Sequence, residues 1–167
     1  DYFQQAPSTF IQSTNVPVPS DYIIGPGDNF KIYLYGSFNK EFTAEVSREG
    51  VVFFPDLGPI NVSGQTFSES EKVIKDIVAN KMIGTDINIT MGTLRSINVY
   101  IMGEAFQPGL YTVSSLSTLT NAIFASGGIN TSGSLRNIQL KRNGKIISEF
   151  DFYDVLLNGD ISKDLRL

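Results

Sequence analysis

Residues 95–111 read RSINVYIMGEAFQPGLY, and this stretch decides how the chain is organised. It opens with an alternating apolar run that predicts a strand, and it continues through a turn that contains Gly103, Pro108 and Gly109. A second short strand is expected at 110–113. The residues on either side of this stretch form two patterns of similar size. We therefore predict an α+β chain of two small β-rich domains.

The first domain is expected over residues 20–95, and it begins with a proline-containing turn. The residues of this turn are Gly25, Pro26, Gly27 and Asp28. Proline fixes its own φ, the glycines permit the reversal, and the aspartate is expected to cap the turn. A half-buried strand follows at 30–35. Two further strand-like runs, at 42–46 and 51–54, flank Glu49-Gly50, and this arrangement predicts a β-hairpin.

A helix is expected from about residue 68 to 83. Thr66 and Glu69 have the spacing of a capping box, and apolar side chains recur at helical spacing after them. Gly84 is placed to end this helix, and an alternating strand at 87–91 closes the first domain.

The second domain is expected over residues 96–167. Ser117 is the expected N-cap of a helix that ends at the pair Gly127 and Gly128, because glycine favours the left-handed backbone that follows a helix. Asn143-Gly144 lies between two alternating runs and predicts a β-hairpin. The order of elements is typical of a small mixed sheet packed on one helix, which is a ubiquitin-like or β-grasp arrangement.

Composition excludes several classes of function. Residues 1–95 carry 7 basic and 11 acidic side chains, for a net charge of −4, whereas residues 96–167 carry 6 of each. Neither half offers the basic face that nucleic acid requires. The chain has no Cys and no His, which excludes disulfides, thiolate or histidine zinc sites, and His-based catalytic triads. No apolar run approaches the roughly 18 residues of a membrane-spanning helix.

Residues 1–19 are expected to form an extended N-terminal arm. The alternating prolines at 16–19 favour an extended backbone, and no helical or strand period precedes them. A solvated linker is one interpretation. The aromatic residues Tyr2, Phe3 and Phe10 favour a second, in which the arm packs on a neighbouring subunit.

An ordered series of motifs resembles the outer-membrane polysaccharide export proteins of bacteria. Its first part comprises Asp21-Tyr-Ile-Ile-Gly-Pro-Gly-Asp28, residues 46–58 and 60–66, and the amphipathic helix that follows them. This part is similar to the family's polysaccharide biosynthesis/export domain. The second part comprises residues 99–105, 108–113, 119–122, 125–128 and 138–144. It is similar to the soluble-ligand-binding β-grasp domain, called SLBB, which follows in that family.

The resemblance implies transport without a cofactor. Members of the family lie in the periplasm and the outer membrane and assemble into homo-oligomeric rings, through which capsular polysaccharide or exopolysaccharide leaves the cell. Their expected partner is an inner-membrane polysaccharide co-polymerase. The sequence departs from the family pattern because it has no lipid-bearing Cys and no C-terminal membrane helix, and because its SLBB domain stops early at 164–167. It is therefore interpreted as a fragment whose association with the outer membrane depends on absent parts.

Four residues are candidate contacts for glycan or for a neighbouring subunit. Tyr33 and Tyr35 alternate with the apolar strand positions, so their rings are expected on the opposite face, where they can stack on a pyranose. Arg136 and Arg142, grouped with Arg95 and Lys141, are candidates to meet an acidic polymer or an acidic neighbour. A solvated strand face is the alternative for these cations, and core packing is the alternative for aromatic residues in general.

The sequence predicts a non-catalytic ring subunit that forms a conduit for polysaccharide. A monomeric glycan-binding module of the cell envelope is the second hypothesis, and a carbohydrate-active enzyme is a weaker third. Glycoside hydrolysis needs two carboxyl groups roughly 5–9 Å apart across a cleft. The spacing of the carboxylates Asp21, Asp28, Glu45, Glu49 and Asp56 along the chain does not establish such a pair.

Overall fold

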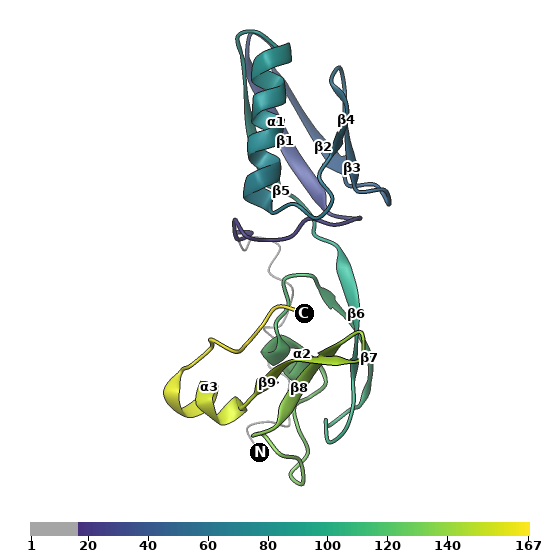
Figure 1. Cartoon of the computed structure of the whole chain (residues 1–167), viewed down its shortest axis with the longest axis vertical. Coiled ribbons are helices and arrows are strands. Elements are labelled where there is room, and N and C mark those ends of the chain that lie inside the picture. The colour runs from purple at the N-terminus through teal and green to yellow at the C-terminus, as the bar shows by residue number, and fades with distance from the viewer. Residues whose placement is uncertain (1–16) are drawn as a thin grey trace. The chain divides into compact units, whose positions relative to one another are not determined.

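The computed structural model describes residues 17–167 and divides at Arg95 into two units (Figure 1). Each unit contains strands and helices, so the predicted α+β class is confirmed. Residues 1–16 of the predicted arm lie outside the described residues, and 17–19 have no regular secondary structure. The elements of the first unit are β1 (Asn29–Gly36), β2 (Lys40–Glu45), β3 (Val51–Phe54), β4 (Gly58–Asn61), α1 (Phe67–Lys81) and β5 (Thr85–Met91).

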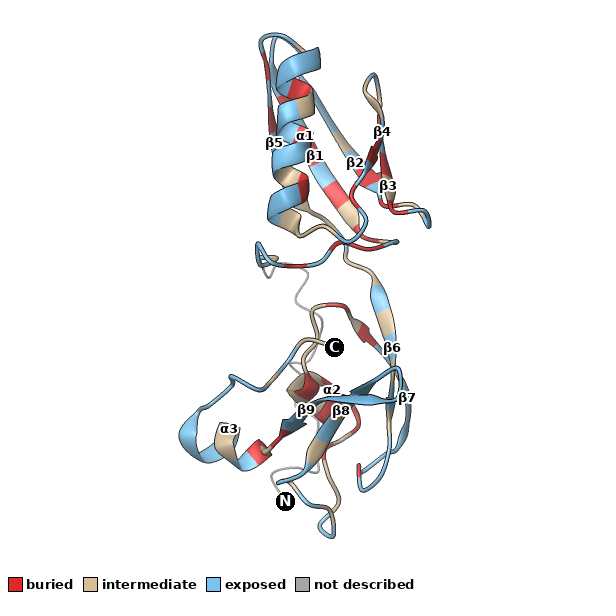
Figure 2. Cartoon of the chain, viewed as in Figure 1, coloured by how far each residue is buried: buried red, intermediate tan, exposed pale blue. Residues whose placement is uncertain are grey.

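The first unit is built on an antiparallel sheet in the order β2-β1-β5. The alternation of β1 buries Phe30, Ile32 and Leu34 on one side of this sheet (Figure 2). The buried side chains of α1 include Ile74 and Val78, and α1 packs along β5. The apolar side of the sheet therefore belongs to the core, and the other side is left to solvent.

The hairpin predicted from residues 42–46 and 51–54 is wrong. β2 pairs with β1 along its length, and only the single bridge Val46↔Val52 joins it to the next strand. β3 instead forms its ladder with β4. The tight turn at Gly50 does form, with φ +77°, but pairing β2 with β1 sets Phe42 opposite Ile32 and extends the apolar side of the sheet. Burial of that side decides the pairing over the local turn signal.

The capping box predicted for α1 is present. Thr66 accepts a hydrogen bond from the backbone N–H of Glu69, whose carboxylate accepts one from the N–H of Thr66 at 2.8 Å. The latter bond, together with the Thr66 hydroxyl, lowers the pKa of Glu69. The helix ends at Lys81, with Met82 as its C-cap, so the predicted end at residue 83 is too late. The chain already turns back through Thr85, whose N–H donates to the Met82 carbonyl at 3.1 Å.

The second unit comprises two antiparallel hairpins and two short helices. Its elements are β6 (Ser96–Ile101), β7 (Gly109–Ser114), α2 (Leu119–Ala125), β8 (Ile138–Arg142), β9 (Lys145–Phe150) and α3 (Phe152–Asn158). The hairpin predicted around Asn143-Gly144 is confirmed, with positive φ at both residues. The single mixed sheet predicted for this unit is not formed, because β6 pairs only with β7 and β8 only with β9 within residues 96–167.

The core of the second unit gathers around α2. Leu119 and Ile123 of this helix pack with Phe150 and Phe152, which are both almost fully buried. Ser117 is not the N-cap of α2: Thr118 takes that position and exchanges hydrogen bonds with Asn121. The Thr118 hydroxyl accepts from the backbone N–H of Asn121, three residues later, as an N-cap does. The N–H of Ser117 instead donates to the Ser114 carbonyl in the preceding turn.

Candidate functional site

Asp28, the last residue of the predicted turn, is buried inside the first unit. Pro26 and Gly27 form the corner of the turn, with Gly27 at φ +90°, and the Asp28 N–H donates to the Gly25 carbonyl at 3.1 Å. The Asp28 carboxylate accepts a hydrogen bond from the Gly25 N–H and another from the Tyr22 hydroxyl, each at 2.9 Å. The side chain therefore contributes to the internal structure of the unit and has no surface to offer a ligand.

Arg95 closes this buried cluster from the far end of the unit. Its backbone N–H donates to Asp28 at 2.8 Å, and its guanidinium forms a short ion pair with the same carboxylate. The guanidinium also donates to the Tyr22 hydroxyl and lies 5.5 Å from the centre of that ring. The expectation that Arg95 meets an acidic polymer is therefore wrong, because its charge is already paired inside the unit.

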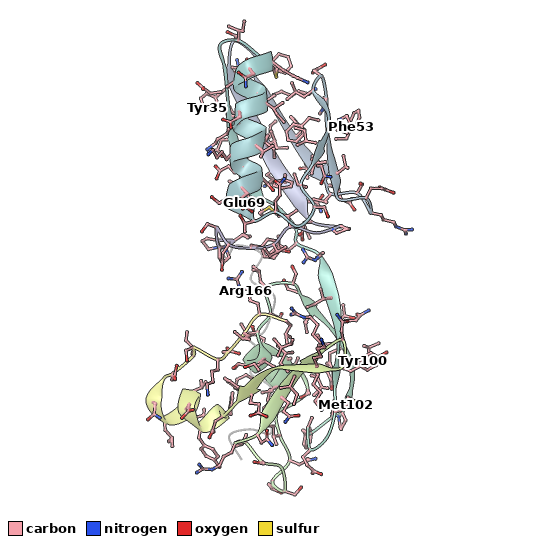
Figure 3. The ribbon with its side chains drawn as sticks, in the orientation of Figure 1. Tyr35, Phe53, Glu69, Tyr100, Met102 and Arg166 are labelled. Carbon is pink, nitrogen blue, oxygen red and sulfur yellow. The ribbon has the colours of Figure 1, made fainter. Side chains whose placement is uncertain are left out.

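Tyr33 and Tyr35 project from the solvent side of β1, opposite the buried Phe30 and Ile32. They are 50% and 42% exposed, and their ring centres lie 6.2 Å apart with 27° between the ring planes. The two rings thus stack as one short apolar strip on the sheet. Figure 3 labels Tyr35 here and Phe53 on β3, which is 68% exposed, so the inward-facing residue of that strand is Phe54.

Polar residues surround the tyrosine pair. Directly opposite Tyr33 lie Glu41 on β2 and Asn88 on β5, and opposite Tyr35 lies Asp86 on β5. In an antiparallel ladder, residues directly opposite share a face, so these side chains flank the rings. All three are exposed. Lys31, two positions before Tyr33, supplies a positive charge on the same face and pairs with Thr43 and Thr90.

Of the two candidate arginines of the second unit, one lies in the loop before β8 and the other in β8. Arg136 precedes β8, and its guanidinium lies 5.0 Å from the ring centre of Tyr153 on α3. Arg142 is the last residue of β8, and both arginines are exposed. Their role as contacts stays a prediction.

The glycines of the second-unit motifs lie in turns or at the start of a strand. Gly103 has φ +84° between β6 and β7, and Gly109, which follows Pro108, begins β7. Gly127 and Gly128 follow α2 with positive φ, and their N–H groups donate to the carbonyls of the last turn. They therefore end the helix and do not present a helix N-terminus to an anion.

Sequence reasoning missed a hollow in the second unit. It has a volume of about 270 Å³, and its walls include Phe106, Phe124, Leu135 and Tyr153. Phe106 is fixed there because its backbone N–H donates to the Gly128 carbonyl at 2.9 Å. No signal in the sequence indicates the hollow, since its walls come from two loops and two helices that meet only after folding.

A second feature of this unit is an exposed apolar group on the outer side of β6 and β7. Tyr100 lies directly opposite Leu110, and Met102 follows β6. Tyr100 and Met102 are 74% and 79% exposed (Figure 3). Side chains of this size rarely cluster on a free surface. Among residues 17–167, no helix has both the length and the apolar character needed to cross a bilayer.

Comparison with known proteins matches both units to family models. The polysaccharide biosynthesis/export protein model matches residues 16–92, and the SLBB domain model matches residues 98–167. The chain belongs to the polysaccharide export protein family. The boundary between the two matches coincides with the division of the structure at Arg95. Asp28 and Tyr22 thus lie within the polysaccharide export match and Arg95 lies three residues beyond it, whereas the hollow lies within the SLBB match.

Curated relatives of this polysaccharide export protein cover both domains. The chain is 31% identical over 144 residues to the polysialic acid transport protein KpsD of Escherichia coli, an alignment that spans 84% of this chain and 26% of that protein. It is 31% identical over 121 residues to the EPS I polysaccharide export outer membrane protein EpsA of Ralstonia nicotianae, spanning 71% of this chain and 32% of that protein. The chain therefore spans about a quarter to a third of the relatives that it matches.

Within residues 17–167, no three acidic side chains gather closely enough to hold a metal ion. Both relatives are named for the transport or export of a polysaccharide. On the solvent side of its sheet, the export domain presents stacked aromatic rings, an amide and separate carboxylates.

Proposed function

We propose that this chain is the periplasmic part of an outer-membrane translocon that exports capsular polysaccharide or exopolysaccharide. The observation that carries the proposal is the uninterrupted succession of a polysaccharide export domain and an SLBB domain, shared with relatives that are named for polysaccharide transport and export. In this proposal the protein works between the periplasm and the outer membrane, and the polysaccharide is its cargo.

The proposed role is passive and non-catalytic. A long hydrated polymer needs a polar conduit with many weak contacts, because tight binding at any point would stall its movement. The net charge of −4 and the exposed mixture of tyrosines, amides and carboxylates on the export domain suit such a conduit. The protein would contribute a surface along which the polymer moves, and the energy would come from partners such as an inner-membrane polysaccharide co-polymerase.

The proposed conduit is a homo-oligomeric ring. Among residues 17–167, strand β2 lies at one edge of the three-stranded sheet and β5 at the other, and each strand of the β6–β7 hairpin pairs on one side only. Edge strands present backbone donors and acceptors that a neighbouring copy can pair with. The exposed pair Tyr100 and Leu110 supplies apolar area beside the second of these edges. Head-to-tail contacts of this kind close into a ring when the rotation between copies permits.

A monomeric glycan-binding module is the second candidate function, and the hollow of the SLBB domain favours it. At about 270 Å³ the hollow is near the lower end of the sizes found for ligand pockets, and Asn130 and Thr131 add polar groups to its aromatic walls. A protein that stays monomeric at all concentrations and binds a defined oligosaccharide in this hollow would support the second function in place of the first.

The proposed function is tested in a strain of the source bacterium from which the gene is deleted. Polysaccharide is extracted separately from the cell surface and from the periplasm, and the strain carrying the restored gene is the control. We expect the polymer to disappear from the surface and to accumulate in the periplasm. Unchanged surface polymer in a strain without a second exporter would contradict an export role.

A further inference from the structure

We propose that the solvent side of the β2-β1-β5 sheet binds neutral, hydroxyl-rich stretches of polysaccharide in preference to polyanionic ones. The inference rests on the proposed export function and adds to it the place and the chemical class of the contact. The surface, which we call the tyrosine face, comprises Lys31, Tyr33, Tyr35, Glu41, Thr43, Asp86, Asn88 and Thr90.

The aromatic rings supply the apolar part of the site. A pyranose ring has a face of C–H groups, and this apolar face is removed from water when it lies against an exposed aromatic ring. Tyr33 and Tyr35 are held two positions apart on one strand, so the backbone of β1 fixes their separation and keeps both rings on the same side. The stacked pair is therefore an elongated platform along the strand, which suits a chain of sugars better than a single one.

The neighbours of the rings supply polar partners. Asn88 offers both a donor and an acceptor beside Tyr33, and Thr90 and Thr43 continue the row with hydroxyl groups. Glu41 and Asp86 are hydrogen-bond acceptors, and sugar hydroxyls are donors that suit them. The tyrosine face therefore combines ring stacking with hydrogen bonding from two adjacent strands.

The charges of this face decide the class of polymer. Glu41 lies opposite Tyr33 and Asp86 lies opposite Tyr35, so each ring has a carboxylate as its direct cross-strand neighbour. Lys31 is the only cation among the eight residues of the face, and it pairs with two threonines at the far end from Tyr35. A sugar carboxylate placed on the rings would meet like charge at short range, whereas a neutral sugar meets acceptors for its hydroxyl groups.

The alternative occupant of the tyrosine face is a second copy of the chain. The same carboxylates argue against it, because a contact between two copies of this face would enclose four carboxylates, from Glu41 and Asp86, and only two Lys31 ammonium groups. The inner side of the sheet lies in the core with α1, so the tyrosine face is the side of this sheet that is open to solvent.

The proposal is tested by nuclear magnetic resonance titration of the whole 167-residue chain. The probes are neutral oligosaccharides of glucose, of mannose and of N-acetylglucosamine, and an oligogalacturonate as the anionic probe. We expect at least one neutral probe to shift the signals of Tyr33, Tyr35 and Asn88, with a lower Kd than the oligogalacturonate. The double variant Tyr33→Ala/Tyr35→Ala should weaken this binding by about tenfold or more.

The matched control is Phe53→Ala, which removes a more exposed ring from another strand of the same domain and should leave the affinity unchanged. The variant Glu41→Gln/Asp86→Asn tests the charge rule, and it should narrow the difference between neutral and anionic probes. Equal affinity of every probe for the wild-type chain, or equal loss in the Phe53 variant, would overturn the proposal. Signals of the tyrosine face that shift on concentrating the protein without sugar would assign the face to a second copy.

These outcomes are separate from those of the deletion strain. Loss of surface polymer in that strain together with no binding at the tyrosine face would leave the export function standing and remove only this inference. Binding at the face together with unchanged export in the deletion strain would support the sugar-binding face and remove the export function. That result would favour the glycan-binding module.

Discussion

Replacing Asp28 with asparagine is expected to lower the free energy of unfolding of the export domain by about 3 kcal/mol. The carboxylate is buried and accepts hydrogen bonds from Tyr22, Gly25 and Arg95. An amide offers one acceptor where the carboxylate offers two, turns an NH₂ group toward donors, and leaves the guanidinium without its counter-charge. The measurement is urea unfolding, followed through the nuclear magnetic resonance signals of residues in β1 and β5.

The control for this experiment is Asp76→Asn on the exposed side of α1, which makes the same chemical change and should alter stability by less than about 0.5 kcal/mol. A loss below about 1 kcal/mol in the Asp28 variant would mean that the buried cluster adds no more than one ordinary hydrogen bond.

The second large effect is expected from Phe152→Ala, which should remove a large part of the free energy of unfolding of the SLBB domain. Phe152 is almost fully buried and lies 5.9 Å, centre to centre, from the rings of both Phe124 and Phe150. Removing a buried phenylalanine side chain costs about 3–5 kcal/mol. A unit of this size has a total stability of only about 4–11 kcal/mol.

Limited proteolysis with mass analysis of the fragments measures this effect. We expect cleavage to accelerate within residues 96–167 while the segment from β1 to β5 persists, because the two units have separate cores. Leu157→Ala, at an exposed position of α3, is the control and should be cut at the wild-type rate. Equal protection of the SLBB domain in the Phe152 and Leu157 variants would contradict the assigned core.

Local signals in the sequence predicted most of the elements. The Thr66–Glu69 spacing gave the start of α1, and Asn143-Gly144 gave the β8–β9 hairpin, because in both cases the deciding contacts lie within a few residues. Strand partners were harder to predict. β2 follows β1 and precedes β3 at short separations. Only the placement of Phe42 and Ala44 on the apolar side of the sheet, opposite Ile32 and Phe30, selects between the two partners.

The candidate site was predictable to a lesser degree. Alternation along β1 was enough to place Tyr33 and Tyr35 on the solvent side, because a strand has a fixed period of two. Alternation alone could not place Glu41 and Asp86 beside the two rings, because their positions depend on the register of β2 and β5 against β1. The ion pair of Asp28 with Arg95 joins residues 67 positions apart, and no local pattern reports a contact at that separation.

The Asp28 cluster gives the proline-containing turn a structural role in the export domain, although the Asp28 side chain offers no binding surface. Its carboxylate joins the start of the export domain to Arg95, the last residue before β6. The domain thus holds both of its ends through one buried group. The tyrosine face lies on the sheet that these ends frame, so the rigidity of the cluster supports the surface that we propose to meet the polymer.

Photo-crosslinking in the living bacterium tests the central claim most directly. A photoreactive amino acid replaces Tyr33, Tyr100 or Arg136 in the full-length protein, and the products are probed with an antibody against the surface polysaccharide. Our account predicts a protein–polysaccharide adduct from the Tyr33 position while export is active, and loss of that adduct when polymer synthesis is stopped. An exporting strain that yields no adduct from any of the three positions would contradict the account.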